Sequence, residues 1–307
     1  MNCWIVSFVV FTFVASGSCR ESSAQPAPTA STPQDGPLAA NPLAEGRSKI
    51  EVDFARTKLN VFTYKPQNWK GERMLFVIHG MDRNAEEYRD HSIGMGDRFD
   101  ALVVVPLFDE KRFPSRRFHL GGIQNEDGSA AKPEEWTYVC IPRIATAIRQ
   151  RESKPDVKLW IIGHSAGGQF TMRMSAFQVA GLERFVAANP GTGLFPRRDW
   201  KFGFGFGGLP ESLSNDARLQ SYLAAPLTLY LGTADNFNEG DLDVSSEAML
   251  QGDGRLQRGR AAFEAGKKLA AERGWKFAWC LVEAKDVDHN HEKMFAHEQC
   301  ERALFGP

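Results

Sequence analysis

The stretch with the clearest chemical potential is a serine between two glycines, at positions 163–167, GHSAG. An apolar segment at 157–162 precedes it, and a helical pattern from about Gly167 follows it. Glycines at these two positions let a strand and a helix pack closely around a sharp turn, which holds the serine hydroxyl out toward a substrate. The spacing is typical of a nucleophile elbow and predicts Ser165 as the nucleophile.

A serine nucleophile needs a base to accept its proton. The elbow resembles one known class of serine enzymes, in which the orienting acid and then the histidine follow the serine along the chain, and we expect the same order here. Three histidines follow Ser165, and His289 lies in a loop just beyond the last expected strand. We therefore predict His289 as the base, with His291 as the alternative. His297 falls inside the expected closing helix.

The expected strand at 276–283 leads to His289. We expect the acid that orients this histidine directly after the preceding strand, at 227–231. Asp235 ends the segment LGTAD, directly after an apolar stretch at 227–231, and is the predicted acid. Asp241 and Asp243, in the same loop, are alternatives. A turn-capping role is the structural alternative for Asp235.

Acyl transfer also needs backbone N–H groups that stabilise the developing oxyanion. The N–H of Ala166, directly after the serine, is one predicted donor. Met81 N–H is the other, because Gly80 allows a close approach of the loop that follows an apolar strand. His79 and His164 precede Ser165, so we interpret them as structural.

A sheet must bring these residues together. Apolar strands alternate with helical patterns, which predicts an α/β fold with a mainly parallel, doubly wound sheet and helices on both faces. We expect the first two strands to form an antiparallel hairpin at one edge. The expected strands are 49–54, 59–65, 74–78, 101–106, 157–162, 184–188, 227–231 and 276–283; the expected helices are 84–99, 134–151, 167–177, 256–273 and 291–304.

One segment between two core strands, 197–210, fits neither a good helix nor a strand because glycines separate its phenylalanines. Phe202, Phe204 and Phe206 are the predicted substrate-binding candidates if the segment is an aromatic lid or acyl-binding wall. A packed surface loop is the alternative.

Composition bounds the organisation of the chain. Its 307 residues, 42% hydrophobic and 24% charged, suit one large catalytic domain, which we place at 47–307. The formal net charge of −1 offers no basic face for nucleic acid.

The amino-terminal region differs from the rest. Residues 1–19 resemble an export signal, and Cys19 after small residues adds a lipoprotein anchor as an alternative. Residues 20–46, rich in Ala, Pro and Ser, are expected to form a disordered tether. We therefore predict a periplasmic or extracellular protein, either released or anchored through lipid.

The three cysteines beyond the tether leave two alternatives open. Cys280 and Cys300 form a disulfide, or Cys140, Cys280 and Cys300 are all free thiols. No cysteine spacing is typical of zinc, and we predict no metal ligand. A divalent cation among the charged residues of 286–292 stays as an alternative.

Several segments together resemble the α/β-hydrolase superfamily, and within it the exported esterases similar to polyhydroxybutyrate depolymerases and feruloyl esterases. These segments are IHGM at 78–81, RNAEEYR at 83–89, VVVP at 103–106, the elbow at 163–168, LGTAD at 231–235 and VDH at 287–289. The resemblance covers about residues 50–305, with one departure, since Asp288 stands where such loops often have glycine.

This resemblance implies an α/β-hydrolase fold and a serine hydrolase that cleaves carboxylic esters through a Ser-His-Asp triad and an acyl-enzyme. It implies no cofactor and no stable protein partner. The substrate would be a small or polymeric ester. Two alternatives stay open: a serine peptidase or amidase, and a non-catalytic exported binding or anchoring protein on the same fold.

Overall fold

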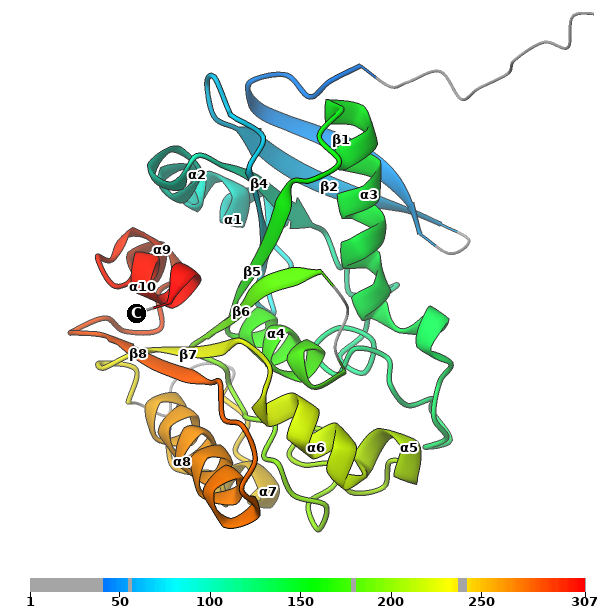
Figure 1. Cartoon of the computed structure of the whole chain (residues 1–307), viewed down its shortest axis with the longest axis vertical. Helices are drawn as coiled ribbons and strands as arrows, with labels where there is room; N and C mark the ends of the chain where they lie inside the picture. Colours follow the sequence, from blue (N-terminus) through cyan, green and yellow to red (C-terminus); the bar gives the residue numbers. More distant parts are fainter. Residues whose placement is uncertain (1–40, 55–56, 178–180, 237–241, 307) are drawn as a thin grey trace, which may run out of the picture. The chain divides into compact units, whose positions relative to one another are not determined.

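The computed structural model describes residues 41–54, 57–177, 181–236 and 242–306 (Figure 1). The expected export signal, Cys19 and most of the expected tether lie outside these ranges, so export and lipid anchoring stay predictions. Among the described helices, none has the length and apolar character needed to cross a membrane.

The described part of the chain is built on one eight-stranded sheet with the order β1-β2-β4-β3-β5-β6-β7-β8. The β1–β2 and β2–β4 pairs are antiparallel, and the remaining pairs are parallel. This confirms the mainly parallel sheet with an antiparallel hairpin at one edge. The strands are β1 Gly46–Phe54, β2 Thr57–Lys65, β3 Arg73–Ile78, β4 Ala101–Pro106, β5 Lys158–His164, β6 Leu182–Ala188, β7 Leu227–Gly232 and β8 Cys280–Ala284.

Helices cover both faces of the sheet, as predicted (Figure 1). They are α1 Ala85–His91, α2 Ile93–Phe99, α3 Cys140–Glu152, α4 Ala166–Phe177, α5 Glu211–Ser214, α6 Asp216–Leu223, α7 Ser246–Met249, α8 Arg255–Arg273, α9 His291–Ala296 and α10 Cys300–Phe305, with short 3₁₀ turns at Pro133–Glu135 and Thr137–Val139.

Alternate residues of β3 enter two separate hydrophobic cores. Phe76 and Ile78 pack in the core shared with α3, α4, α6 and α8. Leu75 and Val77 pack in the core shared with α1, α2, α9 and α10. Because side chains alternate across a strand, burial on both faces needs the continuous apolar strands that the sequence contains.

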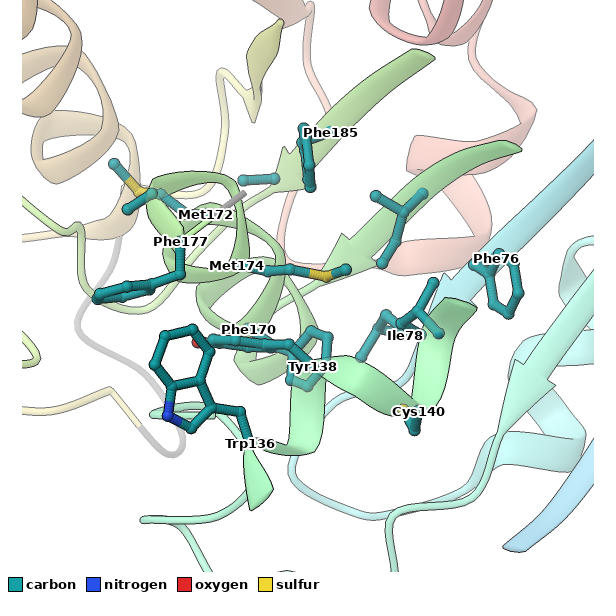
Figure 2. Packing of buried hydrophobic residues seen from close by; sticks show 14 of the residues in the cluster. Phe76, Ile78, Trp136, Tyr138, Cys140, Phe170, Met172, Met174, Phe177 and Phe185 are labelled. Carbon is teal, nitrogen blue, oxygen red and sulfur yellow. The ribbon is translucent and has the colours of Figure 1, made fainter. Parts of the chain in front are cut away.

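Helix α4 is the most enclosed helix of the site region, since all its residues except Gln169 are buried. Its aromatic side chains pack on the segment that precedes α3 (Figure 2). The rings of Phe170 and Tyr138 meet edge to face at 4.8 Å, and those of Phe177 and Trp136 at 5.5 Å. These contacts fix the helix that follows the predicted nucleophile.

Two expected helices are interrupted. The expected 84–99 helix divides at Ser92, whose hydroxyl donates to the carbonyl of Tyr88 and competes with the helical hydrogen bonds there. The expected 291–304 helix divides at His297, whose backbone is extended (φ −63°, ψ 145°). In both places the apolar spacing predicted which residues are buried but not the break.

The expected helix at 134–151 begins only at Cys140. Trp136 has an extended backbone (φ −62°, ψ 140°), and its indole N–H donates to the carbonyl of Ala131. Its side chain is buried nonetheless, so tertiary packing accounts for the periodicity that had suggested a helix.

The last strand is shorter than expected because β8 begins at Cys280 rather than at Lys276. The N–H of Ala278 donates to the carbonyl of Leu223 at 2.9 Å, at the end of α6. The start of the expected strand therefore pairs with a helix terminus instead of with β7.

The disulfide alternative for Cys280 and Cys300 is wrong, because Cys140, Cys280 and Cys300 are all free. Cys300 Sγ lies 3.5 Å from the sulfur of Met95, and Cys280 Sγ accepts from Arg184 at 3.6 Å. The two thiols have separate partners.

Strand β5, helix α4 and strand β3 approach one another so closely that only glycine fits at two positions. A Cβ atom on Gly163 would lie 2.0 Å from the carbonyl oxygen of Gly167. A Cβ atom on Gly167 would lie 2.1 Å from the carbonyl oxygen of Ile78. Both clashes are with backbone, which cannot rotate away.

We predict that Gly163→Ala lowers the free energy of unfolding by about 3 kcal/mol or more, because the backbone of β5 or α4 must move. Gly94→Ala in α2 is the matched control, since a Cβ there meets nothing within 4 Å. It should be neutral or stabilising by about 0.5 to 1 kcal/mol. Urea denaturation of the two variants makes the comparison, and equal stabilities would contradict the packing argument.

Candidate active site

Ser165 lies in a left-handed turn between β5 and α4. Its φ is +57°, a conformation that costs free energy for a residue with a side chain. Its N–H donates to the carbonyl of Ala188 on β6 at 3.0 Å, and its carbonyl accepts from the N–H of Gln169 at 3.0 Å. The turn is thus held from both the sheet and the helix.

Asp235 and His289 form a short hydrogen-bonded pair. His289 Nδ1 lies 2.7 Å from Asp235 Oδ2, and the Asp235 side chain is only 4% exposed. Asp235 follows β7 and His289 follows β8, so two adjacent parallel strands deliver the pair. The structure therefore brings together the two residues predicted as acid and base.

Backbone and side-chain hydrogen bonds clamp the two loops to each other. Ala234 N–H donates to the carbonyl of Val287 at 3.0 Å. Asn189, after β6, accepts from Gly232 N–H at 2.7 Å and donates to the carbonyl of Asp288 at 3.2 Å. Asn189 was not predicted, because a single asparagine after a strand gives no signal in the sequence.

Arg255, at the start of α8, is a second partner of Asp235 that the sequence analysis missed. Its Nη1 lies 3.3 Å from Asp235 Oδ1, and both side chains are almost fully buried. The carboxylate therefore has one oxygen directed to each partner. An arginine at the start of an amphipathic helix is normally exposed, so its position alone did not indicate this contact.

The alternative acids and histidines make other contacts in the described part of the chain, although His291 lies on the wall of the same cavity as Ser165. Asp243 Oδ1 accepts from Ser245 N–H ahead of α7, and Asp241 lies outside the described residues. His291 pairs with His91, and His297 Nδ1 accepts from the N–H of Gln299.

A cavity of about 460 Å³ connects the predicted residues. Ser165, His289 and Asp235 all line it, together with Met81. Its wall also carries four carboxylates and one guanidinium, those of Asp82, Glu87, Asp235, Asp288 and Arg255. The cavity is therefore polar and predominantly acidic.

The Gly80–Met81 peptide lies beside Ser165, since a Cβ on Gly80 would be 3.8 Å from Ser165 Cβ. His79 orients this peptide. Phe108 N–H donates to His79 Nε2 at 3.1 Å, so the proton of this neutral ring sits on Nδ1, which donates to the Gly80 carbonyl at 2.9 Å. In a trans peptide the next N–H points away from that carbonyl, so Met81 N–H is directed away from His79.

The other predicted donor, Ala166 N–H, belongs to the first residue of α4. The first N–H groups of a helix have no intrahelical acceptor, so they are available to an external one. Ala166 is buried, directly after Ser165.

The three phenylalanines of the 197–210 segment do not line the cavity within the described part of the chain. Phe202 and Phe206 are buried, and both rings pack on Phe177. Phe204 is half-buried, and its carbonyl accepts from Phe195 N–H at 2.8 Å. The arrangement corresponds to the packed-loop alternative, because the glycines let the backbone fold on itself and turn two aromatic rings into the core.

Neither a family model nor a curated protein matches the chain. Among solved structures, poly(aspartic acid) hydrolase-1 from Sphingomonas sp. KT-1 is 36% identical with a TM-score of 0.78, over 82% of this chain and 96% of that one. LpqC, a poly(3-hydroxybutyrate) depolymerase from Bordetella parapertussis, is 30% identical with a TM-score of 0.77, over 84% and 89%.

These two relatives, the sheet order and the elbow define the class of protein. The chain belongs to the α/β-hydrolase superfamily, and it is a hydrolase. The resemblance seen in the sequence is thereby confirmed.

Several histidines near the site are held neutral by burial. Burial lowers the pKa of His79, His119 and His291 to about 4 in each case. It lowers the pKa of His164 well below the ordinary value. In the unfolded chain a histidine titrates near pH 6.5, so unfolding in mild acid takes up protons.

We predict that the free energy of unfolding falls as the pH is lowered from about 6.5 toward 4, because only the unfolded state gains these protons. The slope of the free energy of unfolding against pH reports the number of protons taken up on unfolding. At pH 5.5 this number should be about 0.9 lower in His119→Gln than in the original chain. Urea denaturation measured across this range tests it. Above pH 8 the slopes of the variant and the original chain should agree, and an unchanged slope at pH 5.5 would contradict the burial argument.

Proposed function

We propose that this hydrolase cleaves carboxylic esters through a covalent acyl-enzyme on Ser165. The observation that carries the proposal is the 2.7 Å pair of His289 Nδ1 and Asp235 Oδ2 on the wall of the cavity that Ser165 also lines. Nucleophile, base and orienting acid in one cavity are the requirements of this chemistry.

The acylation step uses the free nitrogen of His289. Because Asp235 accepts the proton on Nδ1, Nε2 carries the lone pair and takes the proton of Ser165 Oγ as that oxygen bonds to the ester carbonyl carbon. Collapse of the tetrahedral intermediate breaks the bond to the alcohol oxygen, which receives the proton from Nε2. Acyl-Ser165 and free alcohol are the products.

Deacylation repeats the sequence with water. His289 Nε2 takes a proton from water as the water oxygen bonds to the acyl carbon, and it then returns the proton to Ser165 Oγ as the acid leaves. Arg255 acts as a positioning residue for Asp235. Within the described residues Ser165 Oγ makes no hydrogen bond, and its contact with His289 would form as substrate binds.

The oxyanion of each tetrahedral intermediate would accept from the N–H groups of Met81 and Ala166. The direction of the Gly80–Met81 peptide and the start of α4 directly after Ser165 support this assignment. The neutral form of His79 is needed for it, because that ring accepts from Phe108 and donates to Gly80.

The cavity wall favours a neutral substrate. Asp235 is paired with Arg255, and Asp288 accepts from Lys293 at 3.0 Å, which leaves Asp82 and Glu87 to present charge. A polyanion would be repelled at this wall. We therefore propose a neutral ester, such as the hydroxyalkanoate ester that the depolymerase relative's name specifies.

A second candidate is amide hydrolysis, which the 36% identity to a poly(aspartic acid) hydrolase favours. Turnover of poly(3-hydroxybutyrate) film and of poly(aspartic acid) by the same preparation separates the two. Because the cavity wall is acidic, we expect faster release of product from the poly(3-hydroxybutyrate) film than from poly(aspartic acid). A preference for poly(aspartic acid) would favour the second candidate.

We predict that Ser165→Ala lowers p-nitrophenyl acetate turnover by about 1,000-fold or more, since the acyl-enzyme cannot form. Ser175→Ala is the matched control: this buried serine of the same helix donates to the carbonyl of Met172. Initial rates and melting temperatures are compared. Retained turnover in folded Ser165→Ala, at the level of Ser175→Ala, would contradict the proposal.

A further inference from the structure

A cluster of side chains that could hold a metal ion lies at the junction of α1 and α9, and two of its members, Glu87 and His291, line the active-site cavity. It consists of Glu87 and His91 on α1 and His291 on α9. His91 Nδ1 and His291 Nε2 are 2.8 Å apart, and each of these nitrogens lies 4.0 Å from Glu87 Oε1. Glu87 contributes charge to the cavity wall, but none of the three side chains takes part in the acyl-transfer steps of the proposed ester hydrolysis.

The triangle formed by these three atoms has the size of a metal site. A point in its plane lies about 2.1 Å from all three atoms, as follows from its sides of 2.8, 4.0 and 4.0 Å. Zinc–nitrogen bonds of about 2.0 to 2.1 Å and zinc–carboxylate bonds of about 2.0 to 2.2 Å match this distance. Tetrahedral angles at this bond length need about 3.4 Å between ligand atoms, so the nitrogen–nitrogen edge would widen by about 0.6 Å and the two nitrogen–oxygen edges would shorten by about 0.6 Å.

Neighbouring groups already orient the ligands. Asn84 Nδ2 donates to Glu87 Oε2 at 2.8 Å, which leaves Oε1 for an ion. Glu292 Oε2 lies 3.8 Å from His91 Nε2, so its carboxylate would need to move closer by about 1 Å to accept the proton of a metal-bound imidazole. The ring of His291 is stacked on Tyr88 with centroids 3.9 Å apart, which fixes its plane.

The chemistry of the donors selects the class of ion. Two imidazoles and one carboxylate suit Zn²⁺ and related transition metals rather than Mg²⁺ or Ca²⁺, which prefer oxygen. The surrounding carboxylates attract a cation.

We propose that Glu87, His91 and His291 bind a divalent transition-metal ion of the Zn²⁺ class. Three protein ligands leave a fourth position for water. The ion would join α1, which follows the Met81 loop, to α9, which follows the His289 loop. The inference does not rest on the ester hydrolysis, because its test measures ion binding and stability. A bound ion would compensate the charge that Glu87 presents at the cavity wall.

The site was not predicted from the sequence. The cation alternative at 286–292 contained His291 and Glu292, but the other two ligands come from α1. His91 and His291 are 200 positions apart, and their contact depends on the packing of α1 against α9.

Titration of the EDTA-treated, desalted full chain with Zn²⁺ by calorimetry tests the proposal. We expect one ion per chain and a higher melting temperature with about 100 µM Zn²⁺, because an ion that binds only the folded state stabilises it. His91→Asn and Glu87→Gln should each weaken binding by about tenfold or more. Co²⁺ should give d–d absorption bands typical of nitrogen and oxygen ligands.

Two control variants make the same two substitutions, histidine to asparagine and glutamate to glutamine, at positions outside the cluster. His297→Asn and Glu86→Gln should bind Zn²⁺ like the original chain, since Glu86 accepts from Arg89 on the same helix and is not part of the cluster. Melting in EDTA verifies that each variant is folded. No binding by the original chain at about 100 µM Zn²⁺, or equal binding by folded His91→Asn and Glu87→Gln, would overturn the proposal.

Discussion

The close approach of β3, β5 and α4 is the constraint on which the rest of the site depends. A Cβ atom at Gly163 or Gly167 would lie within about 2 Å of a backbone carbonyl, so the strand and the helix can meet only through glycine. Between them Ser165 takes a φ of +57°, at a cost of about 1 to 3 kcal/mol. The burial of α4 and the hydrogen bond to Ala188 offset this cost.

The parallel sheet then assembles the site from separate parts of the chain. Ser165, Asp235 and His289 each follow the carboxyl end of a parallel strand, and these ends share one edge of the sheet. Alignment alone does not set their geometry. Asn189 ties the β7 and β8 loops together, and Arg255 holds the second oxygen of Asp235.

Much of this arrangement could be predicted from the sequence because continuous apolar strands and the glycine-serine-glycine spacing are local signals. The order serine, aspartate, histidine along the chain then selected the partners of Ser165. Breaks such as those at Ser92 and His297 could not be predicted, since they depend on individual hydrogen bonds and on tertiary packing. Contacts made by one polar residue across the fold, like that of Arg255, also leave no pattern. For the 197–210 segment, composition left two alternatives open, and only the packing of Phe202 and Phe206 distinguishes them.

The central claim is that the strained turn presents Ser165 as the nucleophile of this hydrolase. Its most direct test is to label the chain with an alkyl fluorophosphonate and to map the adduct by mass spectrometry of peptides. If Ser165 is the nucleophile, one phosphonyl group per chain is expected on the peptide that contains Ser165, and labelling is lost when Asp235 or His289 is replaced by alanine. An adduct on another residue, or no adduct on the folded chain, would contradict it.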